Sequence, residues 1–398
     1  MSSKNINEIV IQKNNIRAGV LRRTKDGAEF VYDQEYFSSK DSEAVSFGLP
    51  KSQFVHAVQG ENLHPYFAGL LPEGLRLKAI TEKLKTSPSD YFSIFAEVGF
   101  DCIGDVTVQK DTPKLEFIRK WADVDFYEYF FETLKSDYLE NTAFAGVQEK
   151  ISASMISLPI KGSSRNKSYI LKLNSKDKPR LIYNEYYCLE LAKKCGLKVN
   201  KTRLIPDKNK NHGLLVERFD RLYNIDQKKL TKIHQEDACQ FLNQYPANKY
   251  RLSFREILEQ MNILCTSPKI EILKAIEQYI FSYLICNGDM HAKNISIMVD
   301  PKDKTIVLTP AYDLISTLVY GDENMALKID GKDKKLNRKI FVSFAEAFDI
   351  PSIAIESKIE ALLKNVSKNK GILKKIGFEE KKEIYLFKNI NERLKSLS

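Results

Sequence analysis

Two acids and an amide between positions 289 and 313 are the residues of this 398-residue sequence whose types and spacing best suit chemistry. Asp289 directly follows an apolar stretch, Asn294 comes five positions later, and Asp313 follows a strand-turn-strand pattern. An acid at the end of a buried helix is costly unless it is hydrated, paired or bound to a ligand. We therefore expect the three side chains to converge at one opening, where their hard oxygen atoms would suit Mg²⁺ with phosphate oxygens and water.

The spacing of these residues agrees with phosphoryl transfer. Protein kinases use an Asp as the catalytic base, an Asn at this interval as one metal ligand, and a further Asp after a hairpin as the other. The alternative is that the interval arises by chance, since Asp and Asn commonly cap helices or form turns. A nucleotide-phosphate site is therefore a hypothesis that the rest of the chain has to support.

A buried helix and a hairpin would position these residues. Apolar residues recur every three and four positions over residues 272–284, which predicts an amphipathic helix that Asn287 and Gly288 end. Residues 295–299 and 306–308 flank a polar turn and predict a hairpin. The acids would lie where the helix ends and where the hairpin returns.

A lysine and a glutamate upstream form a second pattern. Residues 168–173 alternate as an apolar strand in which Lys172 shares a face with Ile170, so the ammonium must either reach water or bind an anion such as a nucleotide phosphate. Residues 184–195 predict a helix with Glu185 in its first turn, where the helix dipole alone would stabilise an acid. A strand lysine followed by an early helix glutamate is also the arrangement of the lysine–glutamate pair of protein kinases.

Two further segments suit a nucleotide site. Residues 142–153 place Gly146 among small residues before a strand, where backbone N–H groups could cover a phosphate. The segment matches neither the Walker A motif nor the three-glycine kinase loop. The apolar run that turns polar at residues 217–220 could present backbone groups to an adenine edge while it links two lobes.

The composition predicts a globular protein of two or three packed units, because 43% of the residues are hydrophobic and 11% aromatic. Six scattered cysteines without a Cys-x-x-Cys motif and five dispersed histidines predict reduced thiols and argue against a zinc enzyme. A net charge of +10 suits a solvated lysine-rich surface or attraction to nucleic acid or an acidic partner. Without an apolar run of membrane-spanning length or a signal peptide, we expect a cytoplasmic protein with no membrane contact.

The pattern of elements predicts three units. Residues 1–112 read as a small α+β unit without evident chemistry, which suggests packing or contact with a partner. Residues 113–220 would form the ATP-binding lobe and residues 221–398 a helical catalytic lobe.

Seven ordered motifs together resemble the HipA family, the serine/threonine kinase toxins of bacterial toxin–antitoxin pairs. The N-terminal unit resembles the N-terminal subdomain of that family through residues 70–72, 97–99 and 104–107, so the resemblance spans nearly the whole chain. The seven motifs are residues 145–150, 169–173, 184–188, 216–221, 235–240, 289–294 and 308–313.

The resemblance implies an α+β, protein-kinase-like two-lobed fold with an N-terminal α+β subdomain and a mainly helical C-terminal lobe. It implies ATP and Mg²⁺ as cofactors, with Asp289 as the catalytic base toward a protein hydroxyl and Asn294 and Asp313 as metal ligands. His291 and Lys293 would act beside the base, Lys293 by helping to neutralise the transferring phosphoryl group. The implied ATP-site residues are Lys172 on the α and β phosphates, Ala145, Gly146, Val147, Gln148, Glu149 and Lys150 over the triphosphate, and Glu185, Glu217, Arg218 and Phe219.

The sequence departs from the family at one regulatory position. Founding members carry a serine just before the segment that resembles residues 145–150, and its autophosphorylation ejects the loop and silences the kinase. The matching residue here is Ala143, with Thr142 beside it. We therefore expect self-inactivation to be absent, displaced to Thr142, or replaced by control through a partner.

The resemblance also implies a partner and a target. The partner would be a HipB-like helix-turn-helix antitoxin that contacts the N-terminal subdomain and carries the chain to operator DNA. The target would be a bacterial protein, such as an aminoacyl-tRNA synthetase, whose phosphorylation stops translation and growth. Two alternatives remain open at this point: an ATP-binding corepressor without kinase turnover, and a small-molecule phosphotransferase.

Overall fold

The computed structural model describes residues 6–60, 63–109, 123–129, 156–161, 168–174, 178–224 and 229–398. Its N-terminal subdomain is built on an antiparallel sheet in which β4, β3, β2, β1 and β5 are neighbours in that order. Aromatic side chains, Phe30, Phe67 and Phe95 among them, fill the core between this sheet and its helices. The elements are β1 (Glu8–Lys13), β2 (Ile16–Thr24), β3 (Gly27–Tyr32), α1 (Gln34–Ser38), β4 (Val55–Gln59), α2 (Pro65–Gly69), α3 (Gly74–Leu84), α4 (Tyr91–Val98), η2 (Gly99–Asp101) and β5 (Val106–Val108).

The second unit is an antiparallel sheet in the order β6, β7, β9, β8, with helix α6 packed against it. Its elements are β6 (Ile156–Lys161), β7 (Ser168–Leu173), α6 (Leu181–Lys194), β8 (Thr202–Pro206) and β9 (His212–Glu217). The predicted strand at residues 168–173 is confirmed. Helix α6 begins three residues before the predicted start at 184.

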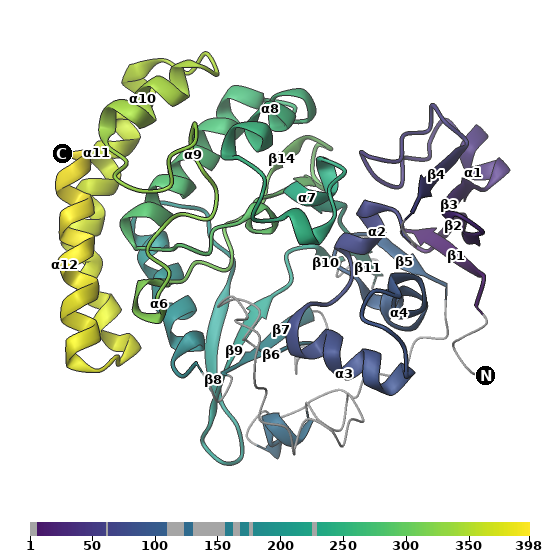
Figure 1. The fold of residues 1–398 in the computed structure, drawn as a ribbon, viewed down its shortest axis with the longest axis horizontal. Coiled ribbons are helices and arrows are strands. Elements are labelled where there is room, and N and C mark those ends of the chain that lie inside the picture. Colours follow the sequence, from purple (N-terminus) through teal and green to yellow (C-terminus); the bar gives the residue numbers. More distant parts are fainter. Residues whose placement is uncertain are drawn as a thin grey trace.

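The third unit is mainly helical and surrounds the buried helix α9, which confirms the helix predicted from residues 272–284. Figure 1 shows the N-terminal subdomain at one end of the molecule and helices α11 and α12 at the opposite end. The elements are β10 (Arg221–Asn224), β11 (Lys229–Lys232), β12 (Gln235–Asp237), α7 (Ala238–Phe241), η5 (Pro246–Asn248), α8 (Phe254–Leu264), α9 (Pro268–Leu284), η6 (Ala292–Asn294), β13 (Ser296–Val299), β14 (Ile306–Leu308), η7 (Leu318–Tyr320), α10 (Arg338–Glu346), α11 (Ser352–Asn369), η8 (Lys370–Ile376) and α12 (Glu380–Leu397).

The predicted hairpin is confirmed as β13 and β14, which pair antiparallel. Strand β5 begins at Val106, two residues after Gly104, whose φ of 85° lies in the left-handed region and interrupts the extended backbone. All six cysteines lie in the described residues, where they are free and buried. Among the described helices, none has the length and apolar character that crossing a membrane requires.

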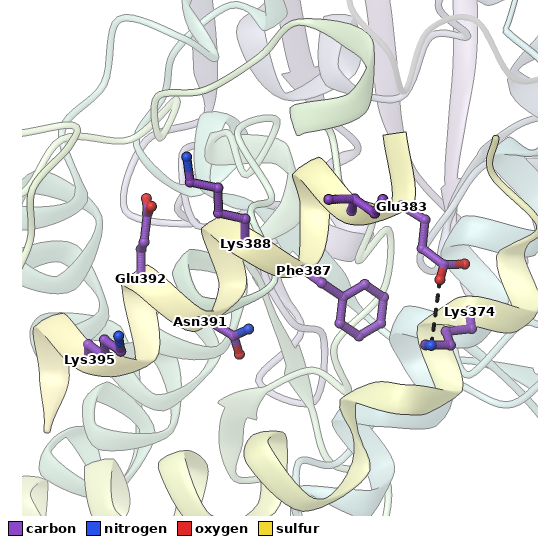
Figure 2. A pocket seen from close by; sticks show the side chains of 8 residues that line it. Lys374, Glu383, Phe387, Lys388, Asn391, Glu392 and Lys395 are labelled. Atoms are coloured by element: carbon purple, nitrogen blue, oxygen red, sulfur yellow. Dashed lines mark ion pairs between the residues drawn. The ribbon is translucent and has the colours of Figure 1, made fainter. Parts of the chain in front are cut away.

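An open groove runs along the outer side of α12 (Figure 2). Phe387 lies near the ammonium of Lys374, which pairs with Glu383 at 3.7 Å. Both partners of this ion pair are partly or fully exposed, so it contributes little to stability. The groove lies on the C-terminal helices, apart from the residues with predicted chemistry.

A buried charged cluster docks the N-terminal subdomain on the third unit. Lys13 Nζ lies 2.9 Å from an Asp105 carboxylate oxygen, and the His234 ring bridges Asp105 Oδ1 at 2.9 Å and Glu236 Oε1 at 3.0 Å. Burial and Lys13 lower the pKa of His234, but Asp105 and Glu236 together raise it above its ordinary value. Glu236 also accepts the backbone N–H of Phe47 at 2.8 Å, so both units contribute to the cluster.

A second buried cluster fastens the subdomain to the segment that links the two lobes. The Arg218 and Arg221 guanidinium groups both lie 3.0 Å from Asp101 Oδ1, and both pair with Asp220. Asp220 in turn accepts the backbone N–H of Gly104 at 2.9 Å. The N-terminal subdomain is therefore held by two charged clusters from which water is largely excluded.

Replacing Asp105 with Asn should lower the free energy of unfolding by about 3–5 kcal/mol, because Lys13 and His234 would keep buried charge without their shared counter-ion. Urea titration of both proteins measures the difference. The matched control is Asp26→Asn at an exposed turn, which should stay within about 0.5 kcal/mol of the wild type. Equal stability of the two variants would contradict the role given to the cluster.

The pH dependence of that difference has a definite sign. Burial raises the pKa of Asp105, but His234 and Lys13 outweigh it and hold the pKa well below the ordinary value of 3.8. The stabilisation is therefore fully present above pH 3.8 and is lost as the pH falls below it. The wild type and Asp105→Asn should accordingly converge in strongly acidic solution.

Candidate active site

The ammonium group of Lys172 lies between two carboxylates. Its Nζ is 2.8 Å from both carboxylate oxygens of Glu185, and it also contacts Asp313 Oδ1. The three side chains come from β7, from α6 and from the segment after β14. The structure thus brings together the strand lysine and the helix glutamate that the sequence suggested, and it adds the second acid.

The charges of this triad follow from its burial and its pairing. Burial lowers the pKa of Lys172, but Asp313 and Glu185 raise it above its ordinary value, so the amine stays protonated. Burial raises the pKa of Glu185, whereas for Asp313 the attraction of Lys172 outweighs burial and lowers the pKa. Asp313 is therefore the acid that stays ionised most readily.

Asp313 reaches the cavity from an uncommon backbone conformation. Its φ is 52°, in the left-handed region that few residues other than glycine adopt, although Asp and Asn tolerate it best. Ala311, two residues before Asp313, is held by backbone hydrogen bonds to Lys198 and Asn200. The fixed segment and the left-handed turn direct the carboxylate toward Lys172.

The segment from Asn287 to Asn294 is a tightly folded loop after α9. Gly288 has no room for a side chain, because a Cβ atom there would lie 2.6 Å from the backbone oxygen of Asn324. The Gly288 N–H donates to Thr317 Oγ1 at 2.7 Å, and the His291 N–H donates to Asn294 Oδ1 at 3.0 Å. These bonds fix the loop independently of any ligand.

Asp289 is 3% exposed and accepts a hydrogen bond from the Tyr250 hydroxyl, 2.8 Å from its Oδ1. The Asp289 N–H donates to Asn287 Oδ1 at 3.2 Å. Tyr250 was not predicted from the sequence, because a single tyrosine 39 residues before its partner carries no recognisable spacing. Its hydroxyl fixes one oxygen of the carboxylate that the sequence singled out.

The His291 ring is buried, and both of its nitrogens lack a hydrogen-bond partner within the described part of the chain. Burial lowers its pKa to about 4, so the ring is neutral at physiological pH. It packs edge-on against Tyr250, with the ring centroids 5.0 Å apart. A neutral imidazole in this position can donate one hydrogen bond and accept another.

Lys172, His291, Asn294 and Asp313 line a cavity of about 340 Å³. Ile170, Val216 and Phe219 are among its apolar lining residues. Asp289 and Glu185 are not among the lining residues, although Asp289 belongs to the loop that carries His291. The predicted site residues that line the cavity are Lys172, Glu217, Arg218, Phe219, His291, Lys293, Asn294 and Asp313.

Arg218 and Lys293 were both predicted as site residues, but in the structure their charged groups pair with acidic side chains. The guanidinium of Arg218 pairs with Asp101 and Asp220, so it serves the docking of the N-terminal subdomain. The ammonium of Lys293 contacts Glu73 and Asp237. The predicted phosphate loop at residues 145–150, with Thr142 and Ala143, lies outside the described residues.

Two family models match the chain in order. A model of the HipA N-terminal domain matches residues 9–109, and a model of the HipA-like C-terminal domain matches residues 142–370. The chain belongs to the HipA family. Lys172, Glu185 and Asp313 lie within the part that the C-terminal model covers, and residues of the part that the N-terminal model covers also line the cavity.

Similar proteins extend across most of this HipA-family chain. Y4mE of Sinorhizobium fredii, named as a candidate kinase, is 28% identical over 331 residues, which cover 75% of each chain. The serine/threonine-protein kinase toxin HipA of Shewanella oneidensis is 24% identical over 294 residues, which cover 67% of this chain and 66% of the toxin.

A solved structure of the HipA, HipB and operator DNA complex from Shewanella oneidensis MR-1 contains a similar chain. The match has a TM-score of 0.72 at 18% identity and covers 98% of this chain and 96% of that one. At this identity the likeness shows the fold. The predicted α+β, kinase-like fold of the HipA family is therefore confirmed.

The predicted metal ligands of this HipA-family chain, Asn294 and Asp313, are oxygen donors. Among the described residues, no group of three or more His, Cys, Asp or Glu side chains is arranged to hold a metal ion. Asn294 and Asp313 both line the cavity, and the Asn294 oxygen that accepts the His291 N–H keeps a second lone pair. One carboxylate and one carboxamide suit Mg²⁺, which takes its remaining ligands from phosphate and water.

Replacing Gly288 with Ala should destabilise the protein by about 1–3 kcal/mol, because the new methyl group would overlap the Asn324 carbonyl and force the loop to move. Thermal and urea unfolding measure the effect. Gly371→Ala is the matched control, since nothing lies within 4 Å of a Cβ there. A Gly288→Ala protein as stable as Gly371→Ala would show that the loop is not closely packed.

Proposed function

We propose that this chain is a HipA-like serine/threonine-protein kinase that transfers the γ-phosphoryl group of Mg²⁺-bound ATP to a hydroxyl group of a bacterial protein. The observation that carries the proposal is the Lys172 ammonium held between Glu185 and Asp313 at the cavity wall. Protein kinases need this lysine–glutamate pair and a metal-binding aspartate in place before transfer. The names of the relatives support a kinase.

Each side of the cavity has a separate task in this proposal. Ile170 and Val216 would cover one face of adenine, and Phe219 and Tyr312, with ring centroids 6.2 Å apart, would border the other. Lys172 would bind the α and β phosphates. Mg²⁺ held by Asn294 and Asp313 would neutralise charge on the β and γ phosphates.

Asp289 would accept the proton of the substrate hydroxyl, while Tyr250 holds its other carboxylate oxygen. The neutral His291 ring would donate a hydrogen bond to a phosphate oxygen, because burial keeps it unprotonated and its nitrogens have no described protein partner. Most of the catalysis would therefore be positioning and charge neutralisation.

The proposed partner is a HipB-like helix-turn-helix antitoxin. The similar HipA chain of Shewanella oneidensis was solved with HipB and operator DNA. We propose that the antitoxin likewise brings this chain to an operator, and that the kinase acts in the cytoplasm. A translation component is the proposed target, and growth arrest the proposed consequence.

Asp289→Asn should reduce phosphoryl transfer at least about hundredfold, because the hydroxyl would lose its proton acceptor. The measurement is labelling of lysate proteins by γ-labelled ATP and Mg²⁺ with the purified chain. Asp349→Asn, at an exposed position, is the matched control and should label as the wild type does.

Three outcomes separate the proposal from its rivals. Labelling of a protein band that Asp289→Asn abolishes supports a protein kinase. Labelling of a metabolite alone would indicate a small-molecule phosphotransferase, and ATP binding without any transfer would indicate a corepressor. Wild-type turnover by Asp289→Asn would show that Asp289 is not the base.

Tyr250→Phe should lower kcat about tenfold, equivalent to about 1.4 kcal/mol, with little change in the KM for ATP. The substitution removes only the hydroxyl that holds Asp289 and keeps the ring contact with His291. Steady-state kinetics with the identified substrate measure both constants. An unchanged kcat would exclude a part for the hydrogen bond in turnover.

A further inference from the structure

The ammonium of Lys293 is directed at the N-terminal subdomain. Its Nζ lies 3.2 Å from Glu73 Oε1, 3.3 Å from Asp237 Oδ2 and 3.0 Å from the Gly69 backbone oxygen. Glu73 and Gly69 belong to the segment around the link between α2 and α3, 220 or more positions before Lys293 in the chain. A residue of the candidate catalytic loop therefore shares its charge between Asp237 of its own unit and Glu73 of the N-terminal subdomain.

Glu73 also pairs with a second ammonium group, that of Lys249. Its Oε2 contacts the ammonium of Lys249, and the backbone oxygen of Lys249 accepts the Ala292 N–H at 3.1 Å. The next residue is Tyr250, whose hydroxyl donates to Asp289. One carboxylate thus joins the loop itself to the segment that supports Asp289.

The electrostatics and the local structure agree with this bridging position. Burial raises the pKa of Glu73, but Lys293 and Lys249 outweigh it and lower the pKa to about 2, so the carboxylate stays ionised. Glu73 is the N-cap of α3, yet its side chain makes no capping hydrogen bond. The side chain is instead committed to the two lysines.

The segment that carries Glu73 is fixed against the catalytic lobe. Helix α2 packs against α7, as Figure 1 shows, and the Tyr66 backbone oxygen accepts the Gln240 side chain at 3.0 Å. A Cβ atom on Gly69 would lie 2.5 Å from Gln240 Cγ, so α2 and α7 approach each other so closely that only glycine fits at this position. Tyr245 adds a hydrogen bond to the Leu63 backbone oxygen at 3.0 Å.

We propose that Glu73 is a positioning residue for phosphoryl transfer, which holds Lys293 and Lys249 so that the loop and Tyr250 keep Asp289 in place. The N-terminal subdomain is then a working part of the catalytic centre as well as a surface for a partner. This inference rests on the kinase function proposed above.

The first test compares Glu73→Gln with the exposed Glu82→Gln on the same helix, each in the full-length chain. Glu73→Gln should lower kcat at least about tenfold and leave the KM for ATP within about twofold, because the carboxylate acts on the loop and not on the nucleotide. Glu82→Gln should match the wild type in both constants. Thermal unfolding of each variant reports the folded fraction.

The second test asks whether the ion pair acts as one unit. Lys249→Met alone should also lower kcat, and the Glu73→Gln, Lys249→Met double variant should lose less than the product of the two single losses. A purely structural pair would lower the melting temperature without separating kcat from KM. If Glu73→Gln does not fold, Lys249→Met decides the question by the same split.

The outcomes distinguish this inference from the function on which it rests. A wild-type chain that transfers no phosphate overturns both. A wild-type chain that turns over, with Glu73→Gln and Lys249→Met equally active, overturns only the positioning role. Loss of kcat at unchanged KM in folded protein, with non-additive losses in the double variant, supports it.

Discussion

A charge buried away from water has to be paired, and this requirement determines how the cleft is built. The Lys172 ammonium is paired by Glu185 of α6 and by Asp313 of the segment after β14, so the small sheet and the helical unit meet at one cation. Removal of one partner from such a group leaves an uncompensated charge. Because the pKa of Glu185 is raised and that of Asp313 is lowered, Asp313 is the carboxylate whose charge a divalent cation beside it would offset.

The same requirement explains how the N-terminal subdomain is attached. Arg218 and Arg221 meet Asp101 at the linking segment, and Lys13 meets His234 through Asp105. Buried ion pairs add little net stability compared with apolar packing, but they tolerate no shift in register because a shift would separate the charges. We infer that the subdomain is held in one orientation, which places residues 69–73 at the rim of the cavity.

The sequence predicts those features of the fold that depend on residues close together in the chain. The period of residues 272–284 predicted a buried helix, and the apolar strand around Lys172 left two outcomes for its amine, contact with water or with an anion. Glu73 and Tyr250 could not be found in this way, because each acts across a contact between elements distant in the chain. Arg218 lines the cavity, but its charge is satisfied by Asp101 and Asp220, which sequence spacing could not indicate.

The position of Lys293 shows why adjacency to a catalytic residue does not imply a shared task. Residues Ala292–Asn294 form a 3₁₀ turn, in which successive side chains leave the axis about 120° apart because three residues complete one turn. Lys293 and Asn294 both line the cavity, but the Lys293 ammonium pairs with Glu73 and Asp237, which border the same cavity. This short turn therefore carries both the proposed metal ligand Asn294 and Lys293, which pairs with the N-terminal subdomain. A displacement of that subdomain would accordingly displace the loop that carries Asp289.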